Sequence, residues 1–213
     1  MASSFDYKKE YKDLYLPGQK PSIIKVPEMI FIMADGKGDP NTGAEYKNAL
    51  EVLYGLSYSI KMSKMSGTQP SGYFEYVVPP LEGLWWGGDD CFDGTNIVDK
   101  NKFCWTAMIR QPEFVTTEVF EEAKRVLNKK KPQLDLSLAR RTSFAEGLCA
   151  QIMHIGSYDD EPATIHVMTQ FIAESGYRCD ISDDRRHHEI YLSDPRKTAA
   201  HKLKTVIRHP IAK

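Results

Sequence analysis

The sequence predicts an α+β fold made of a strand-helix-strand-strand module that occurs twice. Apolar runs rich in β-branched and aromatic residues alternate with segments whose apolar side chains recur at the period of a helix. The order of these elements in the first half of the chain returns in the second half. With 213 residues, 41% of them hydrophobic, the chain is long enough to bury a sizeable core.

The first module is expected over about residues 21–115, after an N-terminal extension of residues 1–20. Its first strand, residues 23–34, is interrupted by Pro27, which indicates a bulge or an edge position. A helix is predicted over residues 43–62, because its apolar side chains fall on one face. Further strands are expected over residues 73–78, 81–86 and 103–110, with a polar loop over residues 87–102.

A connecting helix leads to the second module, which is expected over about residues 134–210. Thr117 is a good N-cap for the connecting helix, and Pro132 ends it. The helix of the second module begins near Pro162, a typical first-turn residue, and ends at Gly176. Strands are predicted over residues 136–144, 148–155, 177–181, 187–192 and 204–209, the third and fourth of them paired as a hairpin.

Two pairs of similar stretches support the duplication. Residues 107–112 (AMIRQP) resemble residues 205–210 (TVIRHP), and residues 74–76, which a proline follows, resemble residues 188–191. Two such modules packed about a pseudo-two-fold axis leave a central cleft between them. A cleft of this kind is a common place for a ligand.

Composition narrows the class of protein. The net charge of -1 gives no indication of binding to nucleic acid or to an anionic membrane. No apolar run approaches the ~18 residues of a membrane span, and residues 1–20 are too polar for a signal peptide. The four cysteines are widely spaced, which favours reduced thiols in a cytoplasmic protein: Cys91, Cys104, Cys149 and Cys179. The oligomeric state stays open.

The stretch from His187 to Lys197 carries the strongest functional signal. As a strand it places Glu189 and Tyr191 on one face together with His187, and His188 on the other face. If the face of Glu189 meets apolar and aromatic groups, its carboxylate is costly to bury without compensation, which indicates function. The pattern leaves open which face is buried.

Aromatic residues and one histidine are candidates for ligand contacts. Trp85 and Trp86 lie beside glycines in one strand, where they point to opposite faces, so we expect only one of them to line a given cavity. The further candidates are Trp105, Tyr54, Tyr58 and His154. For each of these four, packing in the core is the alternative interpretation.

No metal or cofactor is expected. His187 and His188 are adjacent strand residues, so they cannot bind one ion without distortion, and the chain lacks the His-Glu-x-x-His spacing. It also lacks a Walker loop, a dinucleotide-binding glycine motif and a Gly-x-Ser-x-Gly nucleophile elbow.

Four motifs resemble the long, stand-alone branch of the GyrI-like small-molecule-binding proteins. They lie at residues 34–41 (ADGKGDPN), 80–86 (PLEGLWW), 153–161 (MHIGSYDDE) and 187–196 (HHEIYLSDPR), and the resemblance covers about residues 20–210. It implies two strand-helix-strand-strand modules about a pseudo-two-fold axis, with an aromatic cleft and a central glutamate. The glutamate corresponds to Glu189, and the paired tryptophans correspond to Trp85 and Trp86.

The resemblance implies three possible roles. Relatives with this domain are drug sensors in transcription activators, a gyrase inhibitor, and enzymes that hydrolyse cyclopropane-bearing cytotoxic compounds. No DNA-binding helix-turn-helix is apparent before residue 20, so we expect a hydrolase with Glu189 as general base and Tyr191 orienting a water. The alternatives are binding of lipophilic cationic drugs without turnover, and a purely structural role. The expected partner is a hydrophobic aromatic small molecule.

Overall fold

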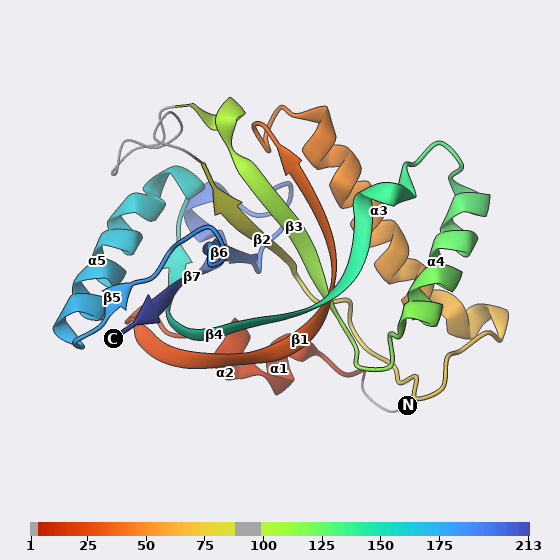
Figure 1. Cartoon of the computed structure of the whole chain (residues 1–213), viewed down its shortest axis with the longest axis horizontal. Helices are drawn as coiled ribbons and strands as arrows, with labels where there is room; N and C mark the ends of the chain where they lie inside the picture. Colours follow the sequence, from red (N-terminus) through yellow and green to blue (C-terminus); the bar gives the residue numbers. More distant parts are fainter. Residues whose placement is uncertain (1–3, 88–98) are drawn as a thin grey trace.

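Six antiparallel strands close into a barrel at the centre of the molecule. The computed structural model describes residues 4–87 and 99–213. Around the barrel the strands follow the order β4-β1-β3-β2-β6-β7, and pairing between β4 and β7 completes the closure (Figure 1). The strands are β1 (Ser22–Lys37), β2 (Leu81–Trp86), β3 (Cys104–Gln111), β4 (Ala139–Ile155), β6 (His187–Tyr191) and β7 (Lys204–Ala212).

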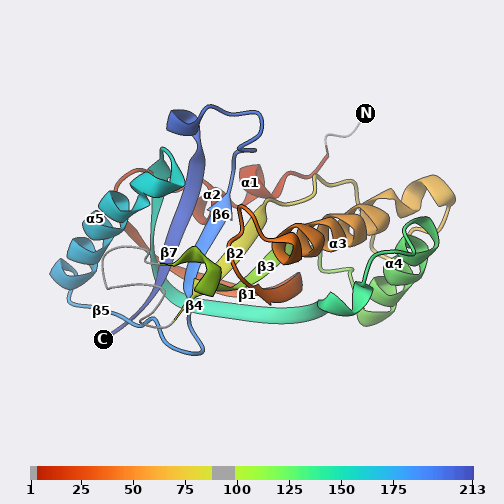
Figure 2. The ribbon, with the colours of Figure 1, turned by 90° about the horizontal axis from the view of Figure 1, so that it is seen from above.

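Helices cover two sides of the barrel. Figure 2 shows α5 at one end of the molecule and α3 with α4 at the other, with the strands between them. Helix α3 packs on β1 and β3, α4 packs on α3, and α5 packs on β4. The helices are α1 (Tyr7–Glu10), α2 (Lys12–Tyr15), α3 (Ala44–Lys61), α4 (Thr117–Lys130) and α5 (Glu161–Glu174). The chain is therefore an α+β protein, as the sequence predicts.

The strands of the two halves of the chain pair in a similar way. In the first half β3 pairs with both β1 and β2, and in the second half β7 pairs with both β4 and β6. The halves join through β1–β4 and β2–β6 pairing. A pseudo-two-fold axis relating two duplicated modules stays a prediction.

Two predicted strand segments have other roles. Residues 73–78 form no regular strand, because the side chains of Tyr73, Phe74 and Tyr76 pack around Phe114 while Tyr76 makes an isolated bridge to Phe5. The prediction of a hairpin between residues 177–181 and 187–192 is also wrong. The short strand β5 (Arg178–Cys179) pairs with the end of β7, and β6 lies between β2 and β7.

The two strands predicted over 136–144 and 148–155 are one long strand, β4. Gly147 lies within it at φ 79°, a conformation that glycine adopts without strain. Gly147 pairs with Val26, and the next pair joins Glu28 to Ala145, so the ladder bends opposite Pro27 rather than ending. At the start of α4 the N-cap is Thr116, one residue before the predicted cap, and its hydroxyl accepts a hydrogen bond from the N–H of Val119.

Residues 4–20, expected as an extension, contribute to the core. Tyr7, Leu14 and Tyr15 are almost completely buried. The carbonyl of Leu14 accepts a 2.8 Å hydrogen bond from Arg208, and the hydroxyl of Tyr15 donates one of 3.3 Å to Glu82. These contacts tie the N-terminal segment to side chains from β7 and β2.

A buried charged cluster fills part of the barrel. His188 lies between the carboxylates of Glu82 and Glu146, 3.0 Å from each, and Arg208 bonds Glu146 at 3.0 Å. Burial opposes the charges, but His188 and Arg208 hold the pKa of Glu146 down at about 2. The carboxylates raise the pKa of His188 to about 9, against the effect of burial. His188 is therefore a structural cation on the inner face of β6.

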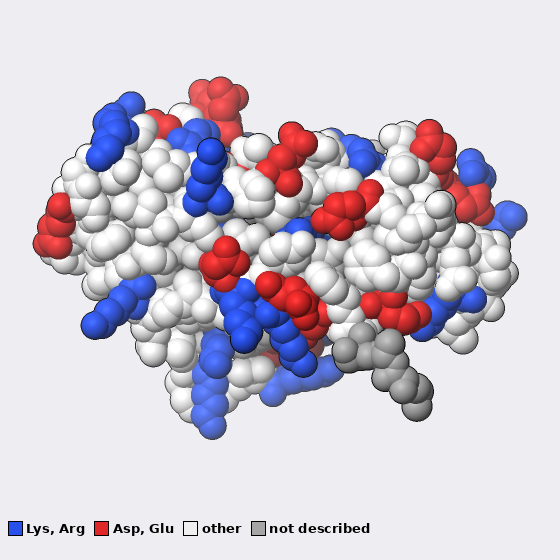
Figure 3. All heavy atoms as spheres, turned by 90° about the horizontal axis from the view of Figure 1, so that it is seen from below, with Lys and Arg blue, Asp and Glu red and all other residues white. Residues whose placement is uncertain are grey.

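The surface carries both signs of charge. On the face shown in Figure 3, lysine and arginine side chains lie next to aspartates and glutamates, without a large patch of one sign. Among the described residues, none of the helices combines the length and the hydrophobicity that crossing a membrane requires. The loop predicted over residues 87–102 falls largely outside the described residues, as does Cys91.

Candidate functional site

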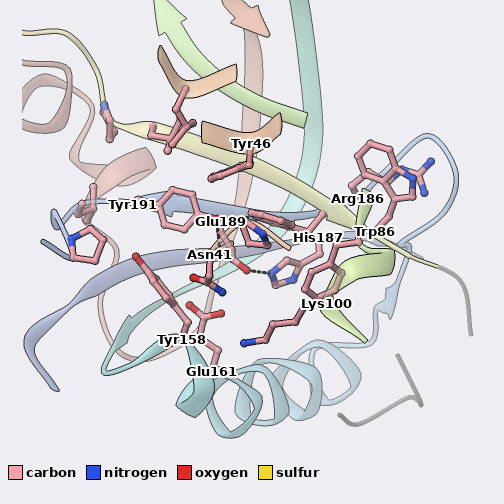
Figure 4. A pocket seen from close by; sticks show the side chains of 18 of the residues that line it. Asn41, Tyr46, Trp86, Lys100, Tyr158, Glu161, Arg186, His187, Glu189 and Tyr191 are labelled. Atoms are coloured by element: carbon pink, nitrogen blue, oxygen red, sulfur yellow. Dashed lines mark hydrogen bonds and ion pairs between the residues drawn. The ribbon is translucent and has the colours of Figure 1, made fainter. Parts of the chain in front are cut away.

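A cleft of about 2070 Å³ lies between α3 and the start of α5. One wall comes from α3 and carries Tyr46 and Tyr54, and the opposite wall carries Tyr158 and Glu161. The strands β2 and β6, which pair with each other, contribute Trp85 and Glu189. Figure 4 shows Glu189 in the cleft. Residues from both halves of the chain therefore border the cleft.

Alternation along β6 places Glu189 in the cleft. His187, Glu189 and Tyr191 border it, whereas His188 and Ile190 are buried on the opposite face. This answers which face of the strand meets the cavity. It also separates two histidines that are adjacent in sequence, since one borders the cleft and the other belongs to the buried charged cluster.

Glu189 is held by two neighbours from its own strand. Oε1 of Glu189 is 2.9 Å from Nε2 of His187, and Oε2 accepts a 2.8 Å hydrogen bond from the hydroxyl of Tyr191. The hydroxyl of Tyr191 accepts a 2.8 Å hydrogen bond from Nε1–H of Trp85. Contacts to both oxygens fix the orientation of the carboxylate.

A glycine makes room for these contacts. Gly83 pairs with Glu189 across the β2–β6 ladder. A Cβ atom at this position would lie 2.7 Å from Nε1 of Trp85 and 3.2 Å from the hydroxyl of Tyr191. Such a Cβ would push apart the two atoms that hydrogen-bond, so the absence of a side chain at Gly83 is required for the arrangement.

Glu161 brings a second carboxyl group to the cleft. It is the first residue of α5, it is buried, and it faces Glu189 (Figure 4). Burial, and next the charge of Glu189, raise the pKa of Glu161 well above its usual range. Oε1 of Glu161 has no hydrogen-bond partner among the described residues. The raised pKa favours the neutral form of Glu161, which can donate a proton to a bound molecule.

Aromatic rings enclose the carboxyl groups. Trp85 lies between Tyr46 and Phe103, with ring centroids 5.8 Å from each, and Tyr158 meets Tyr191 edge-on at 5.9 Å. Burial raises the pKa of the Tyr158 phenol to about 12, so this hydroxyl is neutral and able to donate. The cleft therefore presents flat apolar surface around a polar centre.

The structure brings four of the six predicted ligand contacts to the cleft. Trp85, Trp86, Tyr54 and Tyr58 border it. Both tryptophans do so, which differs from the expectation that only one lines a cavity. Trp86 is the last residue of β2, beyond the final β2–β6 pair at Trp85, and its ring stacks with the Arg186 guanidinium at 4.6 Å.

Trp105 and His154 do not border the cleft. Trp105 is 0% exposed and packs against Gly36, with its ring 4.9 Å from that of Tyr46. His154 is buried, where Nδ1 lies 2.8 Å from the hydroxyl of Thr164 and Nε2 lies 2.9 Å from the carbonyl of Ser157. Both residues are therefore packed in the core, which is the alternative interpretation of the sequence.

Sequence reasoning missed Glu161, Tyr46, Tyr158 and His209 as cleft residues. Glu161 and Tyr158 belong to the motif at residues 153–161, which was a signal for them. Tyr46 follows the apolar stripe of α3 and was indistinguishable from a core residue. No group of side chains among the described residues is placed to hold a metal ion.

A closed barrel with an aromatic cleft around two carboxyl groups is the architecture of a small-molecule-binding protein. Residues 19–212 match the model of the GyrI-like small molecule binding domain, and the chain belongs to this family. No curated protein matches the chain.

Several solved structures are similar over nearly the whole chain. A hydrolase from Listeria innocua is 47% identical with a TM-score of 0.90, covering 98% of this chain and 100% of that one. An uncharacterized conserved protein from Listeria innocua is 48% identical with a TM-score of 0.92 and the same coverage. The C-terminal domain of EcmrR is 12% identical with a TM-score of 0.51, covering 91% of this chain and 98% of that one, which bears on the fold alone.

Proposed function

We propose that this protein hydrolyses cyclopropane-bearing cytotoxic small molecules in its aromatic cleft, with Glu189 as the general base. The observation that carries the proposal is the hydrogen-bonded carboxylate of Glu189 beside the buried carboxyl group of Glu161, whose pKa is raised. Glu189 takes a proton from water, whose oxygen bonds to a strained cyclopropane carbon. General-base catalysis of this kind contributes about 10²–10⁴-fold. The similar Listeria protein described as a hydrolase supports a hydrolytic reaction.

Glu161 completes the proton balance. As the carbon–oxygen bond forms, one carbon–carbon bond of the cyclopropane breaks, and its electron pair moves into the remainder of the molecule. The protonated Glu161 donates its proton to the atom that receives this electron pair. A raised pKa suits a carboxyl group to this role of general acid. Tyr191 holds Glu189 in position, and the aromatic walls hold a flat substrate.

Mass spectrometry of the product tests this proposal. The purified protein and its Glu189→Gln variant are incubated with a cyclopropane-containing DNA alkylator. We expect a product heavier by one water molecule from the wild type, and turnover lower by about 10²–10⁴-fold in the variant. Equal rates for the two proteins would rule out Glu189 as the base.

The second candidate is binding of lipophilic cationic drugs without turnover. The carboxylate of Glu189 beside Trp85 favours it, because a tryptophan face adds about 2 kcal/mol to a desolvated cation contact. Saturable binding by both proteins without a water adduct would support this function. It would leave Glu189 as an electrostatic anchor.

The proposed setting is the cytoplasm, and the proposed ligand is a hydrophobic aromatic small molecule. The free thiols of Cys104, Cys149 and Cys179 suit a reducing compartment. The mixed surface charge suits neither nucleic acid nor an anionic membrane as partner.

A further inference from the structure

A second histidine lies behind the one that contacts Glu189. His209 on β7 is 5% exposed, and its Nε2 is 2.7 Å from Nδ1 of His187. The two rings meet at 68°, with centroids 4.9 Å apart. On its other side, Nδ1 of His209 lies 3.9 Å from the Sγ atom of Cys179 in β5. These contacts form one continuous series from Cys179 through both imidazoles to Glu189.

The proton positions of these groups determine in which direction the hydrogen bonds run. Burial, and next the neighbouring imidazole of His187, lower the pKa of His209 to about 3, so the ring of His209 is neutral and carries one proton. A thiol is a weak donor, and Nδ1 of His209 is the atom that faces it. The neutral ring can carry this proton on Nε2, which leaves Nδ1 to accept the S–H of Cys179.

That proton determines the tautomer of His187. The Nε2–H of His209 donates to Nδ1 of His187, so a neutral His187 carries its own proton on Nε2 and donates to Oε1 of Glu189. If a neutral His187 instead donated from Nδ1 to His209, the unprotonated Nε2 of His187 would face the Glu189 carboxylate, and two acceptors would meet. The observed distances therefore favour one arrangement of protons.

We propose that His209 is a positioning residue, which fixes the ring and tautomer of His187 and thereby the orientation of the Glu189 carboxylate. This role rests on the proposed function insofar as it concerns turnover. A base that is oriented by a third group is a recurrent arrangement in enzymes with activated water or nucleophiles. For metal-binding histidines, loss of the group that orients the ring typically costs about 10–100-fold in activity or affinity, and we expect an effect of this size here.

Nuclear magnetic resonance of ¹⁵N-histidine-labelled protein tests the tautomer without a substrate. In the wild type we expect His187 to carry a proton on Nε2 and none on Nδ1. His209→Leu removes the donor, so we expect mixed tautomers of His187. His209→Gln places an amide N–H where Nε2–H was, and we expect it to restore the wild-type state. A proton on Nδ1 of neutral His187 in the wild type, or the same tautomer in His209→Leu, would overturn the proposal.

Kinetics supply the second readout. We expect His209→Leu to lower kcat by about 10–100-fold with little change in KM, and His209→Gln to recover most of the loss. His201→Leu is the control, because His201 is exposed and lies outside the cleft. Absence of turnover in the wild type would refute the hydrolase and leave the resonance experiment to decide the role of His209. Equal kcat in wild type and His209→Leu, with turnover present, would refute the positioning role.

Discussion

The indole N–H of Trp85 donates a 2.8 Å hydrogen bond to the hydroxyl of Tyr191, across 106 residues of sequence. The two residues come from β2 and β6, the strands through which the two halves of the chain meet on this side of the barrel. Because the hydroxyl of Tyr191 is thereby occupied as an acceptor, its own proton is directed at Oε2 of Glu189. The tryptophan thus acts on the carboxylate through the tyrosine.

Replacing Gly83 should break this relationship. In Gly83→Ala the new methyl group would occupy space that Trp85 and Tyr191 use, so one of the two side chains must move. We expect a loss of about 1–3 kcal/mol in the free energy of unfolding and weaker ligand binding. The control is Gly18→Ala, where a Cβ atom meets nothing closer than 3.8 Å. Urea denaturation and ligand titration of both variants check the prediction, and unchanged binding in Gly83→Ala would contradict it.

Tryptophan fluorescence should report ligand binding through the cleft tryptophans. Trp85 borders the cleft, whereas Trp105 is enclosed in the core. In Trp85→Phe we expect most of the ligand-induced quenching to disappear, and in Trp105→Phe we expect it to remain. Near-ultraviolet circular dichroism verifies that each variant is folded. Full quenching that persists when Trp85 and Trp86 are both replaced by phenylalanine would place the ligand elsewhere.

Glu161 should set the alkaline limit of turnover. Its raised pKa means that the protonated form, which is the proposed acid, is lost only as the pH rises above the ordinary range of a carboxyl group. We expect the rate to fall with rising pH in the wild type. Glu161→Gln should lower kcat by about 10²–10⁴-fold and abolish that fall, since glutamine does not titrate. Measuring kcat against pH for both proteins checks this, and an identical profile in the variant would exclude Glu161 as the acid.

Local periodicity predicted much of the fold and part of the site. The period-2 pattern placed Glu189 and Tyr191 on one face of a strand, because alternation depends only on the backbone. It did not predict that Trp86 also borders the cleft: this residue still pairs with Cys104 of β3, but it lies at the end of β2, beyond the last β2–β6 pair. It also divided β4 at Gly147, because a glycine with positive φ within a continuous strand has the same sequence signature as a turn.

Long-range packing supplied what periodicity could not. Glu161 and Glu189 belong to different elements, and only the fold brings their carboxyl groups together. Trp105 carries the same side chain as Trp85, yet β3 lies under α3, so its ring faces Gly36 and the core. The strand β5 likewise pairs with the end of β7, beyond the part of β7 that pairs with β6, and no local signal encodes this contact.

Removing Arg208 should destabilise the barrel. Arg208→Met leaves Glu146 buried beside a single cation, His188. Breaking a buried ion pair by removing one partner costs about 3–5 kcal/mol. The matched control is Arg125→Met, whose pair with Glu122 is exposed on α4 and contributes less than about 1 kcal/mol. Urea denaturation measures both, and similar losses in the two variants would contradict a structural role for the cluster.

The buried charged cluster should also make the free energy of unfolding depend on pH. The pKa of Glu146 is lowered to about 2, so the stability it contributes is present above its ordinary pKa and is lost as the pH falls towards 2. The pKa of His188 is raised to about 9, so its contribution is complete below its ordinary pKa and is lost as the pH rises through 9. Both shifts describe one interaction, and they are not added together.

We therefore expect the free energy of unfolding to fall by about 3 kcal/mol between about pH 6 and about pH 10, at about 1.4 kcal/mol per pKa unit. Urea denaturation across this range measures the fall. His188→Gln keeps hydrogen-bonding atoms in place but does not titrate, so it should be less stable at the lower pH and should lose this part of the pH dependence. If wild type and His188→Gln lost the same stability between the two pH values, His188 would not be a charged structural residue.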